Sequence, residues 1–108
     1  MKFLFVGLGI LVITLFMAGS LVFAHEQVHQ RINTYFGVES EIEMGVLTGR
    51  TVSQIDASRD DIPTIQSLHA MNELVTYQFA MMLGLLGLGQ VSSILLLGVC
   101  YNGKTTKK

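Results

Sequence analysis

Residues 3–24 read FLFVGLGILVITLFMAGSLVFA, and this uncharged stretch decides the fold. A helix rises about 1.5 Å per residue, so about 20 apolar residues cross a hydrocarbon core of about 30 Å. A second stretch, residues 79–101, is interrupted only by Gln90, Ser92 and Ser93. Because an unpaired backbone group in lipid costs several kcal/mol, both stretches are predicted to be membrane-spanning helices.

Residues 3–24 have a competing interpretation as a cleaved signal peptide. Small residues end the stretch at Ala24, where a signal peptidase would cut. However, Lys2 is the only basic residue before it, and the stretch exceeds the usual signal-peptide core of about 7–15 residues. We therefore favour an uncleaved helix. Cleavage would make His25 the N-terminal residue.

The charges are segregated along the chain of 108 residues. All eight acidic residues and every arginine lie within residues 25–73, whereas the lysines lie near the two ends. Since basic residues mark cytoplasmic flanks, we expect both termini in the cytoplasm and residues 25–73 outside it. The acidic middle excludes a nucleic-acid partner, which requires clustered basic residues. The single cysteine, Cys100, excludes an intramolecular disulfide and a cysteine-based zinc site.

The helices are expected to extend beyond the apolar stretches. Apolar residues continue at three- and four-residue spacing, which predicts a first helix within residues 1–36 that ends at Gly37. Pro63 suits the first turn of a second helix over residues 62–101. Residues 102–108 are predicted to form a basic, disordered tail.

The connecting segment, residues 37–61, is predicted to be a loop with a short β-hairpin. Residues 38–46 alternate around glutamates, and residues 50–55 form a second extended run. Thr48-Gly49 is the expected tight turn between them. The predicted fold class is a mainly α membrane protein, with two antiparallel transmembrane helices joined by an extracytoplasmic segment.

A motif of residues that could bind a metal ion and catalyse a reaction directly follows the first apolar stretch. His25-Glu26-Gln27-Val28-His29 has the pattern H-E-x-x-H on the predicted helix. Residues four apart share a helix face, so both imidazoles can reach one zinc ion at about 2.0–2.1 Å. Glu26 is placed to act as general base on a zinc-bound water. A catalytic zinc site also needs a third protein ligand and an open fourth position.

The second helix returns to the same membrane depth just before its apolar stretch. Glu73, which follows Asn72, is the predicted third ligand. His69 lies one turn before Glu73 and is either an alternative ligand or a transition-state donor. All three histidines of the chain are therefore expected at one depth, next to the bilayer.

These residues resemble those of the zincin metalloproteases. His25-Glu26-x-x-His29 followed by Asn72-Glu73 is similar to the gluzincin pattern, in which a downstream helix supplies a glutamate ligand. The region after Glu73 is also similar to the membrane-bound branch related to the HtpX and CAAX-prenyl proteases. A Gly-Val pair and a hairpin after the motif resemble the site-2 protease family. The resemblance implies a zinc-dependent peptidase, although Tyr77 stands where an aspartate is expected and no Leu-Asp-Gly motif is present.

The sequence thus predicts a small membrane-anchored zinc metallopeptidase that hydrolyses peptide bonds at the membrane surface. Its substrate would be a peptide or a membrane protein. An alternative is a non-enzymatic two-pass membrane protein that serves as an interaction or helper subunit, with interfacial histidines. Glycines in both apolar stretches could permit close helix contact and a homo-oligomer.

Overall fold

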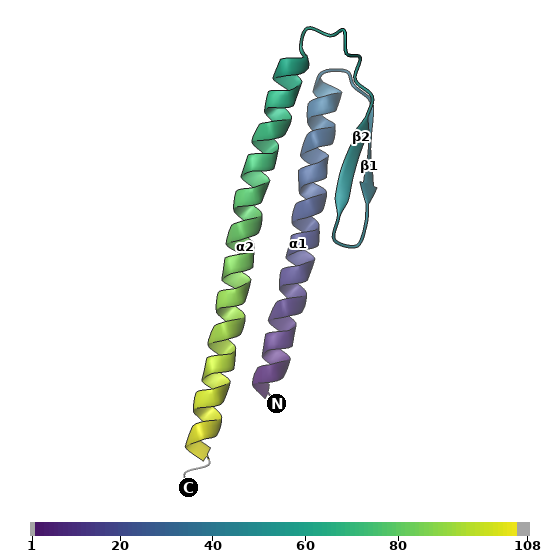
Figure 1. The fold of residues 1–108 in the computed structure, drawn as a ribbon. Helices are drawn as coiled ribbons and strands as arrows, with labels where there is room; N and C mark the ends of the chain where they lie inside the picture. The colour runs from purple at the N-terminus through teal and green to yellow at the C-terminus, as the bar shows by residue number, and fades with distance from the viewer. Residues whose placement is uncertain (1, 106–108) are drawn as a thin grey trace. The chain divides into compact units, whose positions relative to one another are not determined.

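The computed structural model describes residues 2–105 (Figure 1). It contains two long helices, and the chain segment that connects them forms a two-stranded sheet. The elements are α1 (Lys2–Tyr35), β1 (Ser40–Met44), β2 (Gly49–Ser53) and α2 (Ile62–Thr105). Strands β1 and β2 pair antiparallel. The expected mainly helical chain with a short hairpin is therefore confirmed.

Both helices are long and apolar enough to cross a membrane. In each, the most apolar window carries side chains that the rest of the described chain hardly buries. Leu4, Phe16 and Leu95, for example, are all exposed. A helix in the core of a water-soluble protein would bury such residues.

The chain divides into two compact units. The first consists of Met1–Met17 with Met81–Lys108, and the second of Ala18–Ala80. In the first unit, a methyl group at Gly87 would lie 3.0 Å from Cγ2 of Thr14, and one at Gly98 would lie 3.3 Å from Cβ of Phe3. Close helix contact at glycines was one possibility that the sequence raised, and these two glycines permit it. A methyl group at Gly84 or Gly89 would meet no described atom within 4 Å.

The end of α1 follows the predicted pattern. Gly37 has a φ of 70°, and its N–H donates to the carbonyl of Thr34 at 3.0 Å. The N–H of Val38 donates to the carbonyl of Asn33 at 2.8 Å. These two bonds form a Schellman motif, which satisfies the last carbonyls of the helix and turns the chain back toward it.

The bounds of α2 agree with the prediction at the start and differ at the end. The helix begins at Ile62, so Pro63 lies in its first turn as expected. It continues to Thr105, through the first part of the predicted disordered tail, with Lys104 in its last turn. A basic side chain there interacts favourably with the helix dipole. The rest of the predicted tail, residues 106–108, lies outside the described residues.

The hairpin turn lies elsewhere than predicted. The N–H of Gly45 donates to the carbonyl of Thr48 at 2.7 Å, so Val46 and Leu47 form the tip and Gly49 belongs to β2, opposite Met44. Gly49 serves close packing instead of a turn. A methyl group on it would lie 3.0 Å from Cγ of Glu26, on α1.

Candidate metal centre

Three side chains of the second unit direct one ligand atom each toward a common point. Nε2 of His29 lies 3.0 Å from Nε2 of His25 and 3.1 Å from Oε1 of Glu73. Nε2 of His25 lies 3.3 Å from the same Glu73 oxygen. The three predicted ligands thus form a group that could hold a metal ion.

The spacing of these atoms suits a small ion. A tetrahedral ion with bonds of about 2.0–2.1 Å holds its ligand atoms about 3.3 Å apart, which is close to all three observed distances. The imidazoles come from consecutive turns of α1, four residues apart, and the carboxylate comes from α2. The two helices therefore bring the three atoms to separations that suit such an ion.

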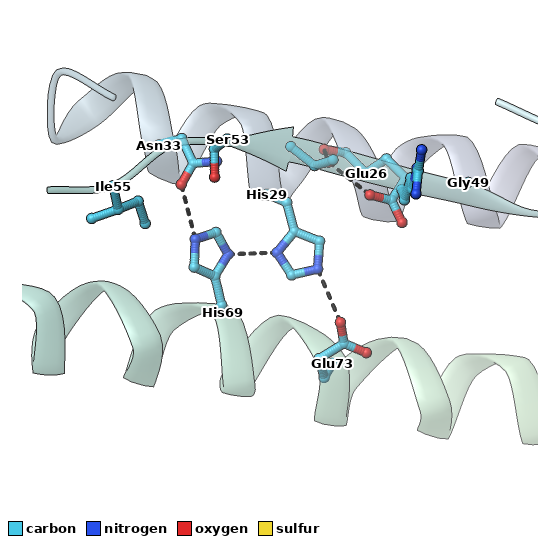
Figure 2. A pocket seen from close by; sticks show the side chains of 10 residues that line it. Glu26, His29, Asn33, Gly49, Ser53, Ile55, His69 and Glu73 are labelled. Atoms are coloured by element: carbon cyan, nitrogen blue, oxygen red, sulfur yellow. Dashed lines mark hydrogen bonds and ion pairs between the residues drawn. The ribbon is translucent and has the colours of Figure 1, made fainter. Parts of the chain in front are cut away.

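A chain of hydrogen bonds behind His29 sets which of its nitrogens carries the proton (Figure 2). Nε2 of His69 lies 3.0 Å from Oδ1 of Asn33, and Nδ1 of His69 lies 2.5 Å from Nδ1 of His29. Because a carbonyl oxygen only accepts, Nε2 of a neutral His69 carries its proton and Nδ1 is left to accept from His29. The lone pair of His29 Nε2 is then free to bind a cation.

Burial favours the neutral form of His69. Desolvation lowers the pKa of His69, and the neighbouring His29 lowers it further, while Glu73 opposes the shift. Asn33, the acceptor at the end of the chain of hydrogen bonds, is 1% exposed. This direction agrees with a neutral His69, the form in which its Nδ1 can accept a proton from His29.

His25 is held from its other side by α2. Its Nδ1 lies 2.7 Å from the hydroxyl of Thr76, and its backbone carbonyl accepts a hydrogen bond from the amide of Asn72 at 3.1 Å. A hydroxyl can accept the proton of Nδ1, which leaves the lone pair of Nε2 directed at Glu73. With both imidazoles in this tautomer, three lone pairs converge, an arrangement that a cation would stabilise.

Glu26 lies beside the three ligand atoms but is not one of them. Its Oε1 is 3.9 Å from Nε2 of His25, and its Oε2 accepts a hydrogen bond of 2.7 Å from the hydroxyl of Thr51, on β2. The Glu26 side chain is only 7% exposed. The hairpin thus covers Glu26 and orients its carboxylate at the edge of the metal centre.

A pocket of about 420 Å³ opens at this centre. Side chains of both helices line one part of it, including His29, His69 and Glu73, and β2 lines another. The Gly45–Thr48 hydrogen bond sets the alternation of the antiparallel pair, which directs the backbone groups of every second β2 residue away from β1. Those residues, Gly49, Thr51 and Ser53, all line the pocket.

The sequence located the side chains of the candidate metal group but not the contacts that support them. His25, His29 and Glu73 come together as predicted, and Glu26 lies next to them. His69 was predicted to be a ligand or a transition-state donor, and its two nitrogens lie 2.5 Å from Nδ1 of His29 and 3.0 Å from Oδ1 of Asn33. Asn33, Thr51 and Thr76 were not predicted to take part. Only the helical spacing of Asn33 from His29 could have indicated its place.

No family model matches the sequence, and neither a curated protein nor a solved structure shows significant similarity to it.

Proposed function

We propose that the chain is a membrane-anchored zinc-dependent peptidase that hydrolyses peptide bonds at the membrane surface. One observation carries the proposal: two imidazole nitrogens and a carboxylate oxygen converge within 3.3 Å of one another, beside the covered carboxylate of Glu26. The similarity of the motif to the gluzincins supports the same chemistry.

The donor set favours zinc in a catalytic role. Two histidines and a glutamate are a recurrent ligand set of catalytic zinc sites, whereas structural zinc sites use four protein ligands. Glu73 is 47% exposed on its side chain and lines the pocket, so the fourth position can admit water or substrate. Zinc bound there would polarise the carbonyl of a peptide and lower the pKa of a bound water to about 7.

Glu26 supplies the proton transfers of the reaction. Its carboxylate accepts one proton from the attacking water and then donates it to the departing amine, so one water molecule is added across the peptide bond. Thr51 fixes Oε2 of Glu26 and leaves Oε1 on the side of His25. The His69–Asn33 pair keeps His29 in the tautomer that binds metal.

The hairpin supports a peptide as the substrate. The backbone groups of Gly49, Thr51 and Ser53 that point away from β1 form a strand edge along the pocket. An extended peptide binds such an edge by main-chain hydrogen bonds, which are independent of its sequence. A peptide bond lying on this edge would be next to the metal ligands.

The apolar stretches of the helices support the membrane location. Residues 3–24 and 79–101 carry exposed apolar side chains on most of their surface, far more than a water-soluble monomer tolerates. With the lysines at the ends, both termini lie in the cytoplasm and the metal centre lies outside it.

Replacement of Glu26 tests the catalytic assignment. The Glu26→Gln variant is expected to bind zinc as the wild type does and to lose about 10²- to 10⁴-fold in the rate of peptide hydrolysis. Glu41→Gln, on the exposed face of β1, is the matched control and should retain full activity. Equal rates in both variants would contradict the proposal. Zinc binding by a wild type that hydrolyses no peptide would assign the centre a structural role in an interaction subunit.

A further inference from the structure

The tip of the hairpin is apolar and exposed. Val46 is 97% exposed and Leu47 is 50% exposed, at positions where turns normally carry Gly, Asn, Asp or Ser. Met44, which precedes the turn, is 43% exposed. Residues 44–49 contain no charge. The most exposed part of the hairpin is therefore apolar, and its contact with water is unfavourable.

Contacts with α1 establish the direction in which the tip points. At the open end of the hairpin, the amide of Gln30 donates to the carbonyl of Ser40 at 3.1 Å. At the closed end, a methyl group on Gly49 would lie 3.1 Å from Cγ1 of Val22. The hairpin thus folds back along α1 (Figure 1). Its tip lies beyond Gly49, level with the end of the apolar stretch 3–24.

The charged residues of the hairpin lie on the open-end side of its uncharged tip. Glu43 and Arg50 face each other across the two strands and form an ion pair of 2.5 Å, the last charges before the tip. Glu39 and Glu41 lie farther from the tip, toward the open end. A hairpin that is charged at one end and apolar at the other matches the change from water to hydrocarbon along α1.

We propose that Val46 and Leu47 insert into the outer half of the bilayer, so that lipid acyl chains cover the tip. The inference rests on the membrane location proposed above and is independent of zinc. Insertion gives the chain a third contact with the membrane, beside its two helices. It fixes the hairpin, and with it the strand edge that lines the pocket, at the membrane surface.

Tryptophan scanning tests this placement, because the chain has no tryptophan of its own. Val46→Trp and, as a second variant, Leu47→Trp are reconstituted separately into phosphatidylcholine vesicles with brominated acyl chains. We expect blue-shifted emission, quenching by the brominated lipid and protection from iodide. Two matched variants serve as references for a tryptophan in lipid and a tryptophan in water. They are Leu95→Trp in the apolar part of α2, and Ala57→Trp in the exposed loop before α2.

Three results would overturn the inference in different ways. Emission from Val46→Trp and Leu47→Trp that matches Ala57→Trp, while Leu95→Trp is quenched by lipid, would place the tip in water. Protection from iodide without quenching by lipid would show that protein, such as a second copy of the chain, covers the tip. Lack of quenching in Leu95→Trp would reject the membrane location itself, and the insertion with it, without bearing on zinc.

Discussion

The two units of the chain use the same two helices for different purposes. In the first unit, the helices approach each other where Gly87 meets Thr14 and where Gly98 meets Phe3, through small or apolar groups. In the second unit, the helix contacts include hydrogen bonds among histidines, Asn33, Asn72, Thr76 and Glu73. The first unit brings backbones close, and the second holds polar atoms at defined distances.

The first unit thus depends on close packing, and the second depends on polar contacts. Packing of small residues tolerates many apolar sequences, because van der Waals contact is not directional. A polar cluster at low exposure requires every donor to meet an acceptor, since an unpaired group costs free energy. Substitutions in one unit should therefore leave the property of the other unchanged.

Among the substitutions that should affect one unit and not the other, we expect the largest effect at His69. Replacement by leucine removes the acceptor for Nδ1 of His29 and leaves Oδ1 of Asn33 unpaired. We expect zinc affinity to fall about 10- to 100-fold, as for other outer partners of metal-binding histidines. Competition with a chelating indicator measures this change. The control is Gln66→Leu, an exposed position on the same helix. Unchanged affinity in His69→Leu would mean that the hydrogen bonds of His69 do not act on the metal centre.

A smaller effect is expected in the first unit at Gly87. A methyl group there would lie 3.0 Å from Cγ2 of Thr14, so Thr14 must move, whereas a methyl group at Gly84 would meet no described atom within 4 Å. We expect Gly87→Ala to be about 1 kcal/mol less stable than Gly84→Ala, measured by unfolding in detergent micelles. Both variants should bind zinc like the wild type. A loss of zinc affinity in Gly87→Ala alone would show that the two units are coupled.

The smallest effect is expected at Asp61, in the loop before α2, where the contribution to stability should depend on pH. Hydrogen bonds from Arg59 lower the pKa of Asp61. A carboxyl whose pKa is lower in the folded state contributes stability above its unfolded pKa, and this contribution is lost as the pH falls through the folded pKa. Asp61→Asn should therefore be slightly less stable than the wild type at neutral pH and equal to it at strongly acidic pH. A difference that persists in acid, or that Asp60→Asn shares, would contradict this account.

The sequence predicted which side chains form the candidate metal group, because their proximity depends on periodicity and topology. The four-residue spacing of His25 and His29 places both on one helix face, and two antiparallel helices return Glu73 to the same depth. The end of α1 at Gly37 and the start of α2 at Pro63 follow from backbone restrictions of these residues. Such features need no knowledge of side-chain conformation.

The features that escaped prediction depend on packing between segments. Thr48-Gly49 has the composition of a turn, yet Gly49 lies in β2, where an added methyl group would come within 3.0 Å of Cγ of Glu26. The hydrogen bond from Thr51 to Glu26 exists only because the hairpin folds back along α1. The contact between His69 and Asn33 joins two different helices, so the sequence alone did not reveal it.

The metal content of the purified protein tests the central claim most directly. We predict one zinc ion per chain in the wild type, measured by elemental analysis after exhaustive dialysis, and none in a His25→Ala, His29→Ala double variant with the same helical content. Wild-type protein that remains free of zinc after incubation with the metal, or a double variant that retains it, would contradict the account.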